Sequence, residues 1–162
     1  MQKTAVSSES GAYRERLGPS LWVLVAAAVA GPMAALVFAP LDTTIALVIG
    51  AAVGVGVVGL LVASAPRVEI SAGTLRAGRA HIGVEHLGDV VALTGDPARH
   101  ARGAGLDPRS WHVLRGGIDG VVVVQVIDPD DPTPAWVLSS RTPDRLAASL
   151  RRAQTTRSTP RT

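Results

Sequence analysis

Two long apolar stretches follow one another near the start of this 162-residue chain. Residues 17–41 and 43–66 carry no charged side chain, and Asp42 alone separates them. The hydrocarbon core of a bilayer is about 30 Å thick, so a helix that spans it needs about 20 apolar residues. Residues 21–39 and 45–65 meet that length. The sequence therefore predicts a transmembrane hairpin of two helices.

The predicted hairpin divides the chain into four parts. Residues 1–12 are small and polar without any period, which is typical of disorder, and the hairpin then occupies residues 13–66. We expect a β-rich domain with a C-terminal helix over residues 67–154 and a disordered tail over residues 155–162. A cleaved signal peptide ending at residues 37–39 is the rival interpretation. The length of the apolar run and the second span that follows both argue against it.

Composition excludes several classes of function. The chain has no cysteine, which rules out disulfides, thiolate metal sites and thiol nucleophiles. The net charge is only +3 and aromatic residues make up 3% of the chain. A nucleic-acid-binding protein normally shows a denser basic stripe with aromatic residues between the charges, so we expect no nucleic-acid partner.

The two spans carry signals for close helix packing. Pro32 follows Gly31 in the first span and predicts a kink, because proline removes a backbone donor and clashes with the carbonyl of Ala28. Small residues at four-residue spacing let helices approach closely in lipid. These helix-packing candidates are Ala27, Gly31, Ala35, Gly50, Gly54 and Gly59. Each span is expected to pack on the other, with a homo-oligomer formed through Gly50 and Gly54 as the alternative.

The residues that flank the spans predict an orientation. Four of them are expected to be anchors at the membrane interface, namely Tyr13, Arg14, Arg16 and Trp22. The alternative is that they are merely the polar start of the first helix. Arginines flank the hairpin on the side shared by both termini, whereas the connection at residues 40–44 has only Asp42. Because positive charge is retained inside, we expect a multi-pass protein of the plasma membrane with both termini and the domain in the cytoplasm.

After Pro66 the pattern changes to short alternating segments. We predict a β-hairpin from residues 67–70 and 75–77, and further strands at residues 78–84, 111–114, 121–127 and 135–140. The most apolar of these, residues 121–127, should be central in the sheet. Residues 85–93 suit either a helix or a strand. The glycines and prolines of residues 94–110 predict a loop without a regular element.

A C-terminal helix is predicted to begin with Thr142 as the N-cap and Pro143 in the first turn. Several strands closed by one helix give a small α+β domain. Its expected architecture is an antiparallel sheet or barrel of the pleckstrin-homology-like (PH-like) kind, and a plain α+β sheet stays open as the alternative.

Between the last two strands lies a proline-bounded acidic segment. Its members are Asp128, Pro129, Asp130, Asp131, Pro132 and Pro134, and we interpret it as a structural turn. Calcium binding is the alternative, but the glycine and distal glutamate of a calcium loop are missing. The four histidines show no zinc spacing. Trp111 and Trp136 are expected in the core, with a stacked cluster that includes Arg115 as the alternative. We expect neither a metal nor a cofactor.

Several of these segments together resemble a known family. They are Tyr13-Arg14-Glu15-Arg16-Leu17, Arg67-Val68-Glu69, Leu75-x-Ala77-Gly78, Asp107-Pro108, the run from Asp128 to Trp136, and Ser140-Arg141-x-Pro143. Over residues 13–150 the chain resembles the actinobacterial membrane-protein family called domain of unknown function 3093. Ala135 departs from the aromatic residue usual in that family. The resemblance implies an integral membrane protein of uncharacterised function and supplies no chemistry.

Three functions fit these observations. The preferred one is a membrane-anchored adaptor, whose domain binds a protein partner or anionic lipid headgroups. The second is a small accessory subunit of a larger membrane complex. An enzyme ranks lowest, because the sequence shows no pairing of a nucleophile with a base and no set of metal ligands.

Overall fold

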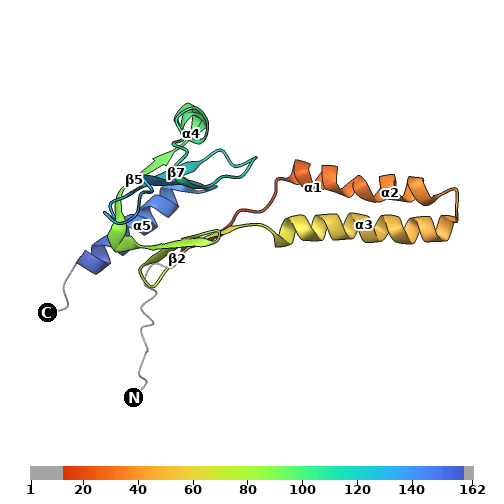
Figure 1. Ribbon diagram of the computed structural model, residues 1–162, viewed down its shortest axis with the longest axis horizontal. Coiled ribbons are helices and arrows are strands. Elements are labelled where there is room, and N and C mark those ends of the chain that lie inside the picture. The colour runs from red at the N-terminus through yellow and green to blue at the C-terminus, as the bar shows by residue number, and fades with distance from the viewer. Residues whose placement is uncertain (1–12, 159–162) are drawn as a thin grey trace, which may run out of the picture. The chain divides into compact units, whose positions relative to one another are not determined.

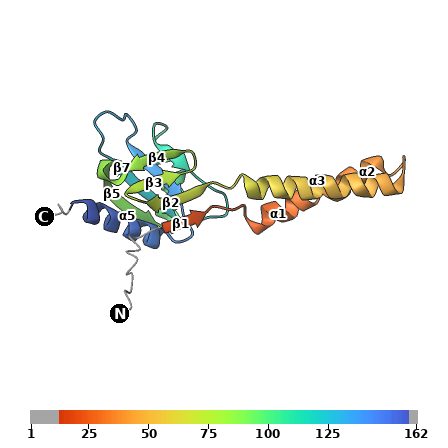
Figure 2. The same cartoon turned by 90° about the horizontal axis from the view of Figure 1, so that it is seen from below.

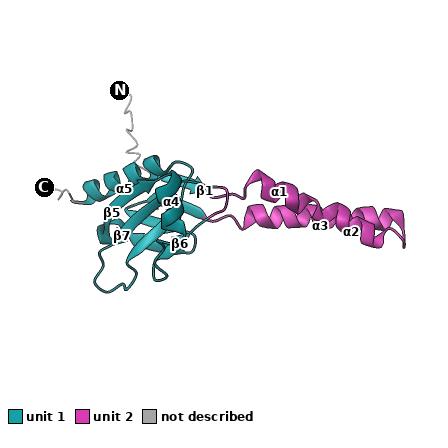
Figure 3. Cartoon of the chain, turned by 90° about the horizontal axis from the view of Figure 1, so that it is seen from above, with its two compact units in different colours: residues 1–16, 67–114, 118–162 teal, residues 17–66, 115–117 magenta. Residues whose placement is uncertain are grey.

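The computed structural model describes residues 13–158, so the predicted disorder of residues 1–12 and of the last four residues falls outside the described part (Figure 1). The described chain forms two compact units (Figure 3). We call residues 17–66 with 115–117 the hairpin unit. The rest of the described chain, residues 13–16, 67–114 and 118–158, is the sheet unit.

The hairpin unit consists of apolar helices. The first apolar segment forms α1 (Leu21–Ala28) and α2 (Ala30–Phe38), and the second forms α3 (Thr43–Ala63). Both segments are long and apolar enough to cross a membrane by length and composition. Asp42, the lone charge between them, is the N-cap of α3, and its side chain accepts a hydrogen bond of 2.9 Å from the amide of Ile45.

A break separates α1 from α2 at Val29. Pro32 lacks the amide that would bond the carbonyl of Ala28 four residues earlier, and its ring crowds that carbonyl. The amide of Met33 still reaches the carbonyl of Val29, at 3.2 Å, so the helix resumes at once. The kink predicted from Pro32 is therefore confirmed.

The first sheet of the sheet unit has the strand order β1-β2-β3-β4 and is antiparallel throughout (Figure 2). Its strands are β1 (Tyr13–Arg16), β2 (Arg67–Ser71), β3 (Thr74–Ala77) and β4 (Ala80–Gly83). The predicted hairpin of β2 and β3 is confirmed. Ala72 and Gly73, both at positive φ (50° and 72°), form its two-residue turn, which matches the twist of the strands it joins.

Strand β1 corrects the predicted boundary of the hairpin. Residues 13–16 pair with β2 in the register Tyr13↔Ile70 to Arg16↔Arg67, so they belong to the sheet unit. Arg16 and Arg67 are neighbours across the sheet although the whole hairpin lies between them in sequence. The apolar helices are therefore an insertion into the connection between two adjacent antiparallel strands.

The second sheet has the order β5-β7-β8-β6. Its strands are β5 (Leu87–Leu93), β6 (Trp111–Val113), β7 (Val121–Val126) and β8 (Ala135–Ser139). A short 3₁₀ helix, η1 (Val84–His86), precedes β5, so most of the ambiguous segment at residues 85–93 is a strand. Strand β7 is central, as predicted. The expectation of a purely antiparallel sheet is wrong for β6, which pairs parallel to β8, because β7 already has β5 and β8 as its two neighbours.

A helix that the sequence did not predict, α4 (Gly95–Arg102), lies in the segment expected to be a loop. Pro97 falls in its first turn, where the missing amide costs nothing, and Asp96 sits at the positive end of the helix. Arg99, His100 and Arg102 occupy the last turn, and Gly103 follows. The residues interpreted as helix breakers are the end signals of a short helix.

The C-terminal helix α5 (Pro143–Ser158) begins where predicted and continues past residue 154, so residues 155–158 are helical rather than part of a tail. It packs against β5 and β7, and α4 packs on the opposite face of the same strands (Figures 1 and 3). Because side chains alternate along a strand, both faces of β7 are apolar, and this explains its run of valines. The fully buried core side chains include Val68, Leu75, Val122, Leu138 and Leu146.

Candidate functional site

The tightest helix contact in the hairpin unit is built from glycines. A Cβ atom added at Gly50 would lie 2.7 Å from the Cβ of Ala35 and 2.8 Å from the carbonyl oxygen of Gly31. One added at Gly31 would lie 2.9 Å from the carbonyl oxygen of Gly50, and one at Gly54 would lie 3.3 Å from the Cα of Gly31. Four of the predicted helix-packing residues therefore face one another, and they join α2 to α3 within one chain.

The other two predicted packing residues lie differently. Gly59 is exposed, and an added Cβ would meet nothing within 4 Å. Ala27 is half-buried on α1, before the break. The four-residue spacing is the same in each case, so spacing alone does not tell which small residues meet.

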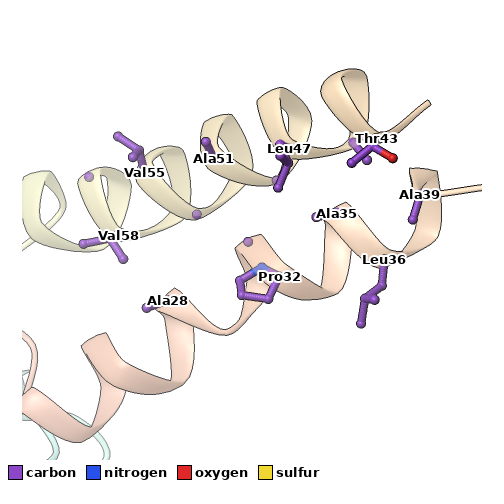
Figure 4. Close-up of a pocket in the computed structure, with 15 residues that line it drawn as sticks. Ala28, Pro32, Ala35, Leu36, Ala39, Thr43, Leu47, Ala51, Val55 and Val58 are labelled. Carbon is purple, nitrogen blue, oxygen red and sulfur yellow. The ribbon is translucent and has the colours of Figure 1, made fainter.

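An apolar groove of about 990 Å³ runs along the hairpin unit (Figure 4). Pro32 and Leu36 line it from α2, and Leu47, Ala51 and Val55 line it from α3. Its only side-chain hydroxyl is that of Thr43. Such walls offer dispersion contacts to another apolar surface and no chemistry to a substrate.

The hairpin unit exposes its large side chains. Of the 17 large hydrophobic residues that are exposed in the described chain, 15 lie between Leu21 and Val62. Only Gly31, Ala46 and Gly50 are buried in the three helices. A helix that is hydrophobic all round is normally buried, either in a large core or in a membrane.

A polar network ties β1 to the start of α5 in the sheet unit. The carboxylate of Glu15 accepts hydrogen bonds from the Tyr13 hydroxyl (2.7 Å), the Ser140 hydroxyl (2.7 Å) and the amide of Arg141 (2.8 Å). The Tyr13 hydroxyl also lies 3.0 Å from the hydroxyl of Thr142, the predicted N-cap. Two of the segments that carried the family resemblance thus meet at this network. No local motif points to this role of Glu15, because its partners Ser140 and Arg141 are more than 120 positions away.

This network changes the interpretation of Tyr13. Its side chain lies on the inner face of the first sheet, and burial raises the pKa of its phenol. Tyr13 therefore also has a structural role in the sheet unit, and its role as an interface anchor stays a prediction. Arg14 and Arg16 alternate with it and are exposed on the outer face, and Trp22 is 82% exposed at the start of α1. These three side chains stay accessible for the predicted contact with a membrane surface.

The acidic segment between β7 and β8 is organised by its own carboxylates. Asp128 accepts from the amide of Asp130 (3.1 Å), and Asp131 accepts from the amide of Thr133 (2.9 Å). The hydrogen bonds of Thr133, from its hydroxyl and its amide, hold the pKa of Asp131 below its ordinary value. His86 also lies 3.4 Å from the second oxygen of Asp128. With Pro129, Pro132 and Pro134 restricting the backbone between them, these contacts fit the structural turn that the sequence suggested.

The two tryptophans of the second sheet pack together. The rings of Trp111 and Trp136 have their centroids 6.2 Å apart and are tilted by 49°, and Trp136 is 4% exposed. The indole nitrogen of Trp111 donates to the carbonyl of Ala77 at 3.3 Å, which connects the second sheet to the first. The guanidinium of Arg79 lies over the ring of Trp111, at 5.4 Å from its centroid.

A second cavity, of about 450 Å³, lies between α4 and the second sheet. Its apolar wall includes Val123 and Val137, and its polar residues are His100, Asp107 and Ser110. The three polar residues are spread over the helix and the following loop, so no motif in the sequence announced them. The guanidinium of Arg109 donates to both carboxylate oxygens of Asp107 and lowers the pKa of that carboxyl group. The carboxylate is therefore engaged by Arg109 rather than by the imidazole of His100, as a catalytic pair would require.

Metal-ligand groupings are missing from residues 13–158: nowhere there do three or more histidine or acidic side chains converge as a metal site would require. The histidines lie apart, with His81 exposed on β4, His86 beside Asp128, and His112 with its ring nitrogen 3.2 Å from the carbonyl of Ser110. The described part of the chain thus offers packing surfaces, a polar network and a small cavity.

Comparison with protein families agrees with this architecture. The family model DUF3093, described as a protein of unknown function, matches residues 12–150, which include both apolar segments and nearly all of the sheet unit. The chain belongs to this family. No curated protein and no solved structure matches it. The match covers the hairpin and most of the sheet unit together, and the family description supplies no chemistry.

Proposed function

We propose that this protein is an integral membrane protein whose hairpin unit anchors the sheet unit as an interaction module at the membrane surface. The observation that carries the proposal is the exposure of 15 large apolar side chains between Leu21 and Val62, in a hairpin unit whose helices contain no ionisable residue. Monomeric soluble proteins rarely expose continuous apolar patches of more than a few hundred Å². In lipid the same exposure costs nothing, and the backbone groups of the helices are satisfied internally.

Charge supports a cytoplasmic sheet unit. Arg14, Arg16 and Arg67 flank the two segments on the side of the chain termini, whereas Asp42 is the only charge between the segments. Basic residues in short flanks are retained inside the cell. We therefore assign both termini and the sheet unit to the cytoplasmic side of the plasma membrane.

The role of an adaptor rests on what the sheet unit presents. Two sheets with one long C-terminal helix support a PH-like organisation, in which a small rigid scaffold displays binding surfaces. An accessory subunit of a larger membrane complex is the second candidate function. The apolar groove beside Pro32 and Leu47 favours it, because a groove of this kind suits a helix of another membrane protein.

Two measurements test the proposal. Full-length protein should stay in the pellet after alkaline carbonate washing, and release into the supernatant would contradict anchoring. Alkaline phosphatase fused after Thr162 should be inactive while green fluorescent protein at the same point is fluorescent. An active phosphatase there would put the sheet unit outside the cell. Purification in mild detergent then separates the two roles, because a stoichiometric multi-span partner would indicate a subunit.

A further inference from the structure

The outer face of the first sheet is rich in arginine. Strand alternation places Arg14, Arg16, Arg67 and Arg76 on this face, and each of them is exposed. His81 lies opposite Arg76 on β4, and Glu69 is the acidic member, between Arg14 and Arg76 in the register. We call these six residues the arginine face. Figure 2 shows the four strands that carry it side by side.

This face accounts for the net charge of the chain. Four arginines against one glutamate give it a charge of +3 with His81 neutral, and the whole chain has a net charge of +3. The rest of the sequence is therefore balanced. A positive field concentrated on one exposed face attracts an anionic surface, whereas the same charges scattered over a domain would not.

Three arginines of this face, Arg14, Arg67 and Arg76, take part in none of the ion pairs of the sheet unit. The ion pairs among the described residues lie elsewhere, at Asp96, Asp107, Asp119, Asp128 and Glu85, and none includes Arg14, Arg67 or Arg76. Arg16 and Arg67 are directly opposite each other in the register. Like charges in that position destabilise a sheet, so a bound anion would replace repulsion by attraction.

The place of the arginine face in the chain brings it to the bilayer. Arg16 is five positions before Leu21, where α1 begins, and Arg67 is four positions after Ala63, where α3 ends. A residue spans at most about 3.6 Å, so these arginines lie within about 18 Å and about 14 Å of the helix ends along the chain. The headgroup layer is roughly 5–8 Å thick on each side of the hydrocarbon core. If the helices cross the membrane, both arginines are close enough to the helix ends along the chain to reach the headgroup region.

We propose that the arginine face binds the phosphate groups of anionic lipids at the surface of the bilayer that the hairpin unit enters. The inference rests on the proposed membrane insertion and adds a lipid class and a named surface to it. Guanidinium groups suit phosphate because they form paired, charge-assisted hydrogen bonds. Each arginine near an anionic leaflet strengthens the attraction about fivefold.

A second basic surface of the sheet unit fits this role less well. A groove between the turn at residues 71–73 and α5 includes Arg151, Arg152 and Arg157. Arg151 donates to the carbonyl of Val90, Arg152 donates to the hydroxyl of Ser149, and Arg157 pairs with Glu85. These guanidinium groups already have partners within the sheet unit. The arginine face is the better lipid surface, because Arg14, Arg67 and Arg76 belong to none of the ion pairs of the sheet unit.

The test uses full-length protein in lipid nanodiscs. The chain has no cysteine, so His81→Cys gives one labelling site on the arginine face, and Ala104→Cys gives a control site on the exposed loop after α4. A fluorophore at each site is quenched by a headgroup-labelled lipid, in discs of phosphatidylcholine alone and in discs with 30% phosphatidylglycerol. We expect at least twofold more quenching at residue 81 in the anionic discs at 0.1 M salt, and loss of that gain at 1 M salt, where screening acts within about 3 Å.

Matched variants identify the residues responsible. Arg67→Gln with Arg76→Gln should abolish the gain, and Arg67→Lys with Arg76→Lys should keep most of it, which separates lost charge from lost folding. Arg99→Gln with Arg145→Gln removes the same charge from exposed positions on α4 and α5 and should change nothing.

Equal quenching in neutral and anionic discs, with protein that resists carbonate extraction, would overturn the lipid-binding inference alone. Protein that fails to enter discs at all would overturn the proposed insertion instead. If soluble polyglutamate protects the fluorophore at residue 81 from quenching while anionic lipid has no effect, the face would be assigned to an acidic protein segment. That result would contradict the proposal.

Discussion

The hairpin unit and the sheet unit sort their side chains by size in opposite ways. In the hairpin unit the buried positions are Gly31, Ala46 and Gly50, and the large aliphatic residues point outward. In the sheet unit the buried positions hold large residues such as Leu138 and Leu146. Water drives large apolar groups together in the sheet unit. In the proposed lipid environment the hairpin has no such drive, and its helices gain most from the close backbone approach that small residues allow.

Charged residues are also distributed differently between the hairpin unit and the sheet unit. All five ion pairs among the described residues belong to the sheet unit, and four of them have at least one partner on its open surface. The hairpin helices contain no charged residue, and Asp42 lies in the connection, where it caps α3. This difference between the two units is what the proposed insertion of the hairpin unit into lipid, with the sheet unit in water, leads us to expect. Substitutions of the same type in the two units should therefore have different effects.

The largest contrast is expected between two tryptophans. Trp136→Ala removes a side chain that is 4% exposed and should cost the sheet unit about 3–5 kcal/mol of unfolding free energy. Trp22→Ala removes a side chain that is 82% exposed and should leave that free energy unchanged. Hydrogen exchange of the β7 amides in detergent-solubilised protein measures both. Similar losses in the two variants would contradict the separate cores of the two units.

A charged substitution on an exposed apolar surface tests whether that surface contacts lipid or water. Val55→Asp introduces a carboxylate near the middle of α3, where the side chain is 74% exposed, and should disfavour membrane insertion by about 2.5–3.5 kcal/mol. Val91→Asp makes the same change on β5, where the side chain is 47% exposed to water, and should be tolerated. Glycosylation mapping of the second span provides the readout for α3. Full insertion of Val55→Asp would mean that this face does not contact lipid.

The glycine contact predicts a third pair. Gly50→Leu forces a side chain against Ala35 and the backbone of Gly31, and overpacking of this kind typically costs about 1–3 kcal/mol. Gly59→Leu adds the same volume where nothing lies within 4 Å and should be neutral. Spin labels at Met33 and Val48, both exposed, report the distance between α2 and α3. The distribution should lengthen only for Gly50→Leu; lengthening for Gly59→Leu as well would argue against an intramolecular contact.

The sequence predicted the parts of this fold that depend on local signals. Composition alone identified the apolar helices, Pro32 identified the kink, and the valine run identified the central strand. The misses are non-local. Strand β1 depends on pairing with residues on the far side of the hairpin, and its only local trace is the alternation of Tyr13 and Glu15 with two arginines. Helix α4 was missed because its proline and glycines were interpreted as breakers when they mark its ends.

The difference between local and non-local signals also applies to the candidate site. The glycine contact of the hairpin followed from spacing, although spacing also included Gly59, which meets nothing. The network around Glu15 and the partner of Trp111 could not be inferred, since they join residues from distant strands. The arginine face has a period-two signal within each strand. Its concentration on one surface depends on the register between strands, and a single sequence does not give that register.

The Glu15 network should contribute less than the core and still be measurable. Glu15→Ala removes the charged acceptor of the Ser140 hydroxyl, on a residue that is 0% exposed, and leaves it the weaker contact with the Tyr13 hydroxyl at 3.3 Å; a lost hydrogen bond to a charged group costs about 1.5–3 kcal/mol. Glu69→Ala removes a carboxylate from the neighbouring strand, on the outer face, and serves as the control. Hydrogen exchange of the β2 amides should show the loss only for Glu15→Ala. An equal loss at Glu69 would assign the effect to charge rather than to the network.

The smallest effect is expected in the acidic turn and depends on pH. The pKa of Asp131 is lowered in the folded chain by the hydrogen bonds of Thr133, so its carboxylate stabilises the fold above the ordinary pKa of an aspartate, about 3.9. That stabilisation is lost as the pH falls below this value and through the lowered pKa. Asp131→Asn keeps an acceptor for the Thr133 amide but does not titrate. Melting temperatures between pH 5.5 and pH 2.5, with and without calcium, should show a slightly steeper acid loss in the parent than in the variant, and no response to calcium in either. A melting temperature that calcium raises only in the parent would replace the structural turn by a metal site.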